Sequence, residues 1–291
     1  MQVIIIKLPA FFEMAYDQKQ ELDLNRILVG TLYEDQQYSL ANMYLQDYLD
    51  DYLNSYDLFN LALNVLLKNQ NFIYAREMIV FADPQWQDQA TKRVLEEEKN
   101  IRVEMAATQR TLAQSFYHLS DGDFRVQRER FENSFKLPLE EWWQGAKFLL
   151  LDPYINPLIR ATLIETAQKL RINESVEYYW LDNKPYRINP AELGSLSDDP
   201  FYRKMKDILD RELGSDDPVA NENLAANLRM QASLLYPRIG VDIKDPELWI
   251  DDMINQYHGI KGFLKVPSEQ NKLFDLVNDL IKDIIQSEQN I

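Results

Sequence analysis

The chain has 291 residues, with 47 acidic and 31 basic side chains and a formal net charge of −16. Nucleic acid is therefore not an expected partner, because phosphate binding requires a basic surface. The lack of cysteine excludes disulfide bonds, thiol nucleophiles and thiolate metal sites. Residues 1–7 are mostly apolar but too short to span a membrane, and no other apolar run approaches membrane length. We expect a cytoplasmic protein that does not cross a membrane.

One pattern of small and bulky residues occurs twice between Ile27 and Pro84. The matching residues are Gly30, Tyr33, Tyr38, Ala41 and Leu45 in the first copy, and Ala62, Val65, Phe72, Ala75 and Ile79 in the second. Tyr38 and Phe72 are 34 positions apart, as are Ala41 and Ala75, and this is the period of a tetratricopeptide repeat. In such a repeat, a small side chain on each helix permits a close crossing, and the bulky residues fill the adjoining groove. The sequence predicts two helix pairs of a tetratricopeptide-like α-α superhelix.

Asp or Asn followed by Pro indicates many other helix starts, because the Asx side chain caps the first turn and Pro has no amide there to satisfy. These dipeptides begin at Asp83, Asp152, Asn156, Asn189, Asp199, Asp217 and Asp245. Few β-branched runs and only eight glycines also favour helices. The predicted fold class is therefore all-α.

The middle of the chain continues this pattern less regularly. Residues 86–119 carry apolar side chains at helical spacing without a breaker, which predicts one long helix or two nearly continuous ones. The second half of this stretch resembles the first helix of a third copy, which is degenerate because Gln127 stands where an alanine is expected. A fourth copy starts at Trp142 with Gly145 as its small residue, and its second helix, from Pro157, is more typical of a HEAT-type pair.

The C-terminal part begins with a different pattern. Aromatic and β-branched residues around a turn at 182–185 indicate a short β-hairpin over 176–188. Helices are expected at 200–213, 218–236, 246–258 and 267–289, the last with an apolar face that can cap the solenoid. We predict a helical repeat domain over 1–172 and a mainly helical domain over 173–291 that packs on the solenoid or continues it.

Three packing motifs lie at residues 148–160, 234–237 and 246–249. Through them and the repeats, the chain resembles the tetratricopeptide-like proteins of low-GC Gram-positive bacteria. The resemblance implies a helical superhelix over most of the chain. It brings no known activity, because these motifs serve packing and not catalysis.

The sequence lacks the patterns that are typical of enzymes and metal proteins. Its two histidines, His118 and His258, have no Glu three residues earlier, as a di-iron bundle requires. Metalloprotease, phosphate-loop and calcium-loop motifs are also missing. The GxxG stretch at 259–262 is known from loops that clamp a nucleic-acid backbone, but a helix-ending loop is the simpler interpretation. We expect no catalytic residue, cofactor or metal.

The resemblance implies that the first helix of each pair lines a concave face. Extrapolating the register places six residues there: Ile27, Thr31, Phe59, Leu63, Arg110 and Gln114. The first two units offer apolar or small side chains, which favours an apolar peptide or an amphipathic helix as the partner. The alternative is that Phe59 and Leu63 pack against a neighbouring helix, for example from the C-terminal half, because aromatic stripes at helical spacing usually belong to a core.

The predicted function is a non-catalytic scaffold or adaptor that binds protein or peptide on the concave face. The alternative is a peptide-sensing regulator that changes conformation or assembly when its ligand binds. A helix-turn-helix with a basic recognition helix, which such sensors often carry, is not evident in this sequence.

Overall fold

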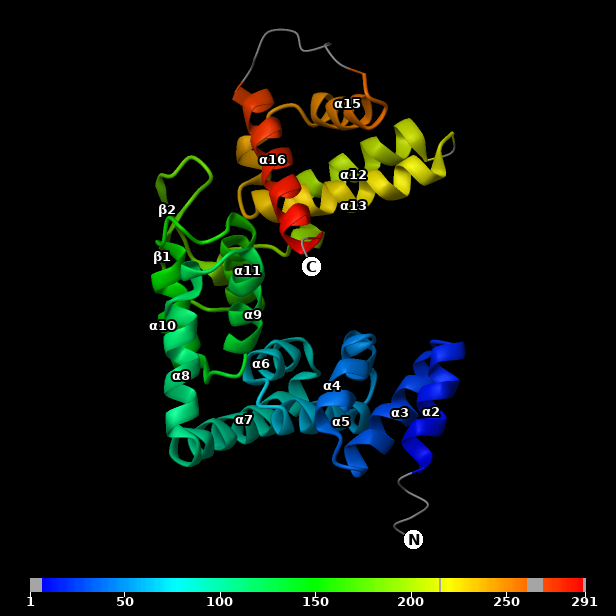
Figure 1. Ribbon diagram of the computed structural model, residues 1–291, viewed down its shortest axis with the longest axis vertical. Helices are drawn as coiled ribbons and strands as arrows, with labels where there is room; N and C mark the ends of the chain where they lie inside the picture. Colours follow the sequence, from blue (N-terminus) through cyan, green and yellow to red (C-terminus); the bar gives the residue numbers. More distant parts are fainter. Residues whose placement is uncertain (1–6, 215, 261–268, 290–291) are drawn as a thin grey trace. The chain divides into compact units, whose positions relative to one another are not determined.

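The computed structural model describes residues 7–214, 216–260 and 269–289 (Figure 1). Helices dominate these residues, and the strands in them form one small antiparallel sheet, so the all-α prediction is confirmed. The predicted hairpin is also present. Its strands β1 (Val176–Tyr179) and β2 (Pro185–Ile188) pair in register from Val176 with Ile188 to Tyr179 with Pro185.

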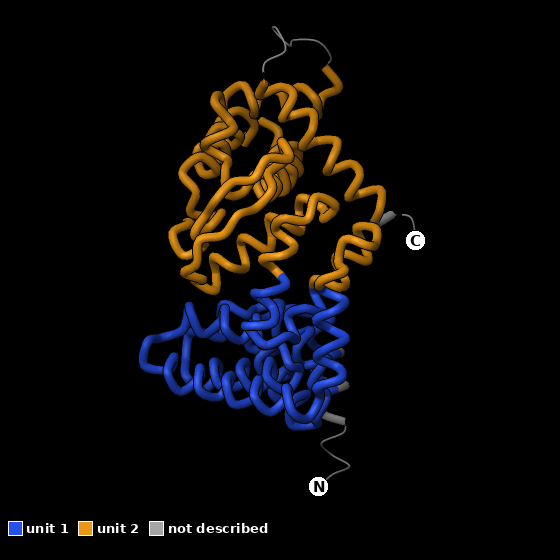
Figure 2. The backbone as a smooth tube through the Cα atoms, turned by 90° about the vertical axis from the view of Figure 1, so that its left-hand side faces the viewer, with its two compact units in different colours: residues 1–116, 132–145 blue, residues 117–131, 146–291 orange. Residues whose placement is uncertain are grey.

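The chain divides into two compact units, which Figure 2 shows in different colours. Unit 1 comprises residues 1–116 and 132–145, and unit 2 comprises residues 117–131 and 146–291. The division falls within α8 (Ala106–Tyr117), α9 (Phe124–Ser134) and α10 (Leu139–Leu150). It therefore differs from the predicted boundary after residue 172, which lies inside unit 2.

Unit 1 begins with helices that pack in chain order. They are α2 (Lys7–Gln18), α3 (Leu22–Glu34), α4 (Tyr38–Gln46), α5 (Tyr56–Lys68), α6 (Phe72–Phe81) and α7 (Pro84–Glu104), with a 3₁₀ turn η1 (Leu49–Asn54) before α5. Each of these α-helices contacts the next one along the chain, and α5 also contacts both α3 and α7. The predicted pairing of α3 with α4 and of α5 with α6 is confirmed.

The two pairs correspond with an offset of 34 residues throughout. Tyr56 starts α5 34 positions after Leu22 starts α3, and the buried residues follow the same offset. Asn25, Leu28, Val29, Leu32, Ala41 and Leu45 of the first pair match Phe59, Ala62, Leu63, Leu66, Ala75 and Ile79 of the second. The turns match as well, because Gln36 and Gln70 have φ values of 62° and 60°. After each, the next N–H bonds the carbonyl five residues back, which satisfies an open helix end.

The small residues at the predicted crossings differ in how closely a neighbouring helix approaches them. Ala41 and Ala75 are fully buried. A Cβ atom added to Gly30 would meet only Cδ2 of Leu61 on α5, at an ordinary 3.8 Å, so the prediction that Gly30 permits a close approach of α4 is wrong. Gly145 does lie at a close crossing, because a Cβ there would be 2.5 Å from Cδ1 of Phe116 on α8.

The stretch predicted as one long helix or two nearly continuous ones forms α7 and α8, which meet at Met105. The Glu98 carboxylate on α7 is buried and accepts two bonds of 2.8 Å from the Arg76 guanidinium on α6. It also accepts a bond from the backbone N–H of Leu139 at the start of α10. This buried ion pair therefore joins three elements of unit 1.

Unit 2 contains the remaining helices. They are α11 (Pro157–Lys169), α12 (Pro200–Leu213), α13 (Pro218–Leu235), α14 (Ile239–Asp242), α15 (Pro246–Tyr257) and α16 (Glu269–Gln289), with 3₁₀ turns η2 (Leu119–Asp121), η3 (Pro190–Glu192) and η4 (Leu196–Asp198). The Asx caps before α11, α12, α13 and α15 each accept a bond from a first-turn N–H, as the Asx-Pro pattern predicts. The helix α13 packs on α11, α12, α15 and α16.

A buried chain of side-chain bonds fixes three of these helices. The Trp249 indole N–H on α15 donates to Oε1 of Gln231 on α13 at 2.8 Å. Nε2 of Gln231 then donates to Oδ1 of Asn278 on α16 at 3.0 Å. The predicted apolar face of α16 includes Leu276, which remains 41% exposed, whereas Val277, Ile281 and Ile284 are buried.

Candidate functional site

The residues that were predicted to line a groove fall into two groups. Ile27 and Thr31 on α3, and Arg110 and Gln114 on α8, are exposed or half-buried. Phe59 and Leu63 are only 2% and 0% exposed, so their assignment to a groove is wrong. The ring of Phe59 lies 5.4 Å from that of Trp86 on α7. The alternative of packing against a neighbouring helix therefore applies, and that helix belongs to unit 1.

A two-residue slip in register explains this error. Phe59 and Leu63 follow Ile27 and Thr31 by 32 positions, whereas the helices correspond at 34. Two residues correspond to a rotation of roughly 200° around a helix. An offset of 32 instead of 34 therefore selects residues on the opposite, buried side of α5. At the correct offset, Ile27 corresponds to Leu61, and Gly30 corresponds to Asn64.

The half-buried side of α5 carries a polar cluster that the sequence did not reveal. Nη1 of Arg93, on α7, donates to Oδ1 of Asn60 at 2.8 Å. Nη2 of the same guanidinium donates to Oδ1 of Asn64. All three side chains are half-buried, and Asn60 and Asn64 lie one turn apart on α5. We call Asn60, Asn64 and Arg93 the Arg93 cluster.

The charge of Arg93 is not compensated at short range. Several other arginines of the described residues form ion pairs with carboxylates, among them Arg26, Arg76, Arg102, Arg187, Arg203, Arg211 and Arg238. The hydrogen-bond partners of Arg93 among the described residues are two neutral carboxamides. Glu96 and Glu97 follow one turn along α7, and both side chains are exposed. The cluster thus presents a positive charge in a chain whose net charge is −16.

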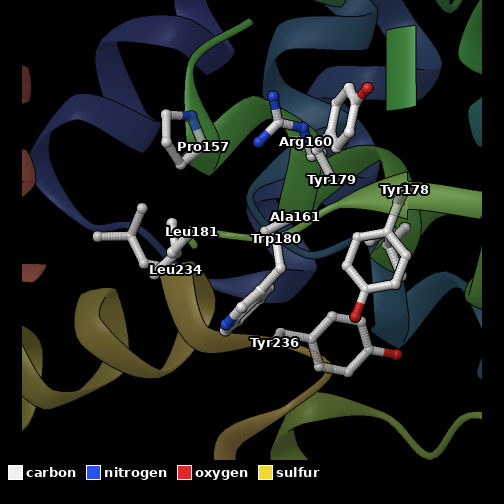
Figure 3. A pocket seen from close by; sticks show the side chains of 10 residues that line it. Pro157, Arg160, Ala161, Tyr178, Tyr179, Trp180, Leu181, Leu234 and Tyr236 are labelled. Carbon is white, nitrogen blue, oxygen red and sulfur yellow. The ribbon is translucent and has the colours of Figure 1, made fainter. Parts of the chain in front are cut away.

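Unit 2 contains a small cavity of about 10 Å³ between α11, the hairpin and the end of α13 (Figure 3). This volume holds about one water molecule. Arg160 lines it, and Nη2 of Arg160 donates to the backbone carbonyl of Asp152 at 2.7 Å. Burial lowers the pKa of the Arg160 guanidinium. These contacts hold the turn before α11, so we assign the cavity to the packing of unit 2.

A larger cleft of about 510 Å³ lies between residues 180–182, α14 and the start of α16. The Arg238 guanidinium forms part of its wall, 4.0 Å from the ring centroid of Tyr186. Nε of Arg238 also lies 2.9 Å from a carboxylate oxygen of Asp242. Since this arginine is already stacked and paired, it offers less to an anionic ligand than Arg93 does.

Three remaining features concern metal ligands, membrane-spanning helices and the GxxG stretch. Within the described residues, no group of three or more His, Cys, Asp or Glu side chains is placed to hold a metal ion. None of the helices that can be described combines the length and apolarity needed to cross a bilayer. Gly259 follows α15 with φ of 69°, as a helix-ending glycine does, and Gly262 lies outside the described residues.

No protein family model, no curated protein and no solved structure matches this chain. The Arg93 cluster is therefore assigned from the geometry of the chain itself.

Proposed function

We propose that the chain is a non-catalytic scaffold in which a tetratricopeptide-like superhelix binds a protein or peptide. The arrangement of the first helices carries this proposal. The helices α3, α5 and α7 contact one another in succession, while α4 and α6 alternate with them along the chain. Helical repeats of this kind build extended binding surfaces from equivalent faces of successive units. The 34-residue offset of the two pairs supports the same assignment.

The proposed binding surface, the first-helix face, comprises Ile27, Gly30, Asn60, Leu61, Asn64 and Arg93. It joins three helices, because Gly30 of α3 faces Leu61 of α5, and Arg93 of α7 bonds to Asn60 and Asn64. Since Phe59 and Leu63 are buried, the reason for expecting an apolar helix as ligand no longer holds. Carboxamides instead favour an extended segment, whose main chain offers both donors and acceptors.

Affinity purification with mass spectrometry tests this proposal, using the tagged chain expressed in its native cells. The Asn64→Arg variant would place a second guanidinium beside Arg93 and obstruct the first-helix face. The control is Asn223→Arg, at an exposed position on α13 of unit 2. We expect a partner that the wild type and the control both retain and that Asn64→Arg loses.

An unchanged partner list for Asn64→Arg, with circular dichroism equal to that of the wild type, would contradict the proposal. The circular dichroism comparison matters because a misfolded variant would also lose partners. Asn64 is only half-buried, so its substitution is expected to leave the core of α5 intact.

A further inference from the structure

We infer that unit 2 binds an uncharged molecule with one ring and an amide group, in a cleft between α13, α15 and α16 (Figure 1). The cleft has a volume of about 210 Å³. Pockets for drug-sized ligands usually measure about 300–1,000 Å³, so a smaller molecule with a single ring fits this one. All the residues that line the cleft belong to unit 2, so the site is distinct from the first-helix face.

The polar part of the cleft wall carries three carboxamides, from Asn227 and Gln231 on α13 and from Asn278 on α16. The Trp249 indole N–H can only donate, so its bond to Gln231 fixes which end of that carboxamide is the oxygen. Nε2 of Gln231 donates to Oδ1 of Asn278, which fixes the second carboxamide in turn. Gln231 and Asn278 are only 1% and 7% exposed, so their amide groups are held in one orientation.

These carboxamides retain hydrogen-bonding groups for a ligand. Nε2 of Gln231 donates to Asn278, and Nδ2 of Asn278 donates to the backbone carbonyl of Phe274 at 2.9 Å, so each amide nitrogen has a second N–H for another acceptor. Oδ1 of Asn227 is buried and accepts no bond from the described residues. An unpaired buried acceptor costs free energy, so a ligand that donates to Asn227 gains by relieving this cost. An amide group offers both the acceptor and the donor that these side chains require.

The remainder of the wall is mainly apolar. Leu224, Met253 and Ile281 are buried side chains from the three helices, and Ile285 of α16 is 43% exposed. Apolar walls with a few placed polar groups are typical of small-molecule sites. The ring of the ligand is therefore expected to pack on these aliphatic side chains while its amide group meets the carboxamides.

The cleft offers no counter-charge to an ionised ligand. None of the described residues that line it is acidic, and its one cation is Lys282, whose Nζ lies 2.8 Å from a carboxylate oxygen of Asp279. The hydrogen bond to Asp279, and the charges of Asp279, Asp275 and Asp283, raise the pKa of Lys282. Since this lysine stays protonated and paired, a neutral ligand suits the cleft better than a carboxylate or an ammonium group.

Proton–nitrogen correlation NMR of the full chain tests the inference with three probes on the same pyridine ring. Nicotinamide carries a neutral amide, nicotinate a carboxylate, and the corresponding picolylamine an ammonium group. The indole N–H resonance of Trp249 is the reporter, because this group bonds to Gln231 in the cleft wall. The chain has five tryptophans, and the other four do not line this cleft, so their resonances are internal controls.

We expect nicotinamide to shift the Trp249 resonance saturably, and the two charged probes to leave it unchanged. Asn227→Leu should weaken nicotinamide binding by about fivefold or more, yet unfold in urea at the wild-type midpoint or above it, because it removes an unpaired buried acceptor. Ile285→Lys replaces a partly exposed part of the apolar wall and should also weaken binding. The control is Asn255→Leu, at a half-buried asparagine of α15 outside the cleft wall, and it should bind within about twofold of wild type.

Three results would overturn the inference. The first is no saturable shift of Trp249 with nicotinamide at up to about 10 mM. The second is equal binding of nicotinate or picolylamine, and the third is equal binding by Asn227→Leu and Asn255→Leu. Should Asn227→Leu fold poorly, Ile285→Lys decides the question, and unchanged nicotinamide binding by that variant would equally reject the site.

Discussion

Alanine substitutions at two glycines should shift stability in opposite directions. At Gly145, a Cβ would lie 2.5 and 2.7 Å from Cδ1 and Cε1 of Phe116. The Phe116 ring is fully buried and stacks on Trp142 with centroids 6.3 Å apart, so it has little room to move. At Gly30, the nearest atom to a new Cβ would be 3.8 Å away, which is an ordinary contact.

The expected magnitudes follow from these distances. Overpacking costs about 1–3 kcal/mol, and replacing glycine by alanine inside a helix returns about 1 kcal/mol. The difference between these two terms is a net loss of up to about 2 kcal/mol. Because the Phe116 ring is confined, we expect Gly145→Ala to lower the free energy of unfolding by about 1–2 kcal/mol. Gly30→Ala should raise it by up to about 1 kcal/mol, since only the helix propensity changes.

Urea denaturation followed by circular dichroism and tryptophan fluorescence measures both variants against the wild type. A Gly145→Ala variant as stable as wild type would refute the close crossing of α8 and α10. A destabilised Gly30→Ala variant would refute the conclusion that Gly30 is free of close contacts with α4.

Three further substitutions test other parts of the fold. Ala75→Leu adds bulk at a fully buried position of α6 and should lower the unfolding free energy by about 1–3 kcal/mol; an unchanged urea midpoint would show that this crossing has spare volume. Glu98→Gln leaves the Arg76 guanidinium without its buried partner and should cost about 3–5 kcal/mol, checked by the same titration; a loss below 1 kcal/mol would contradict the buried pair. Burial and the neighbouring Glu212 and Glu247 raise the pKa of Asp251, so the folded state binds the proton more tightly, and the contribution of Asp251 to stability rises as pH falls through its folded pKa. Asp251→Asn should therefore stabilise the chain at pH 7 and bring no gain at low pH, where Asp251 is protonated in the wild type; equal effects at both pH values would exclude this titration.

Local signals were sufficient for most elements of the fold. The Asx-Pro caps, the hairpin turn and the apolar spacing of α7 and α8 act within a few residues, so they can be read from the sequence. Small residues alone do not give the register between the two helix pairs. Gly30 and Ala62 are 32 positions apart, so they are not equivalent in helices that correspond at an offset of 34. Residues 35–37 and 69–71 each have a glutamine at the centre, and each triplet is followed by an aromatic residue. Aligning these two turns gives the 34-residue offset between the helix pairs.

The candidate site depended on contacts that no local pattern encodes. No local sequence pattern marks Arg93, because its partners lie on another helix, about thirty residues earlier. The helix that contacts α5 after α6 is α7, whereas Arg110 and Gln114, which the extrapolated register assigns to a third unit, lie on α8. An extrapolated repeat cannot show such a change, because it assumes that every unit has the same length.

Site-specific photo-cross-linking provides the most direct test of a binding face formed by α3, α5 and α7. A photoreactive residue is placed at Ile27, which is 48% exposed on α3, or at Val219, which is 68% exposed on α13 of unit 2. Both positions replace an exposed β-branched residue, so the two variants are closely matched. The account predicts that the cellular partner is cross-linked from position 27 and not from position 219. Cross-linking from position 219 alone, or equally from both, would contradict it.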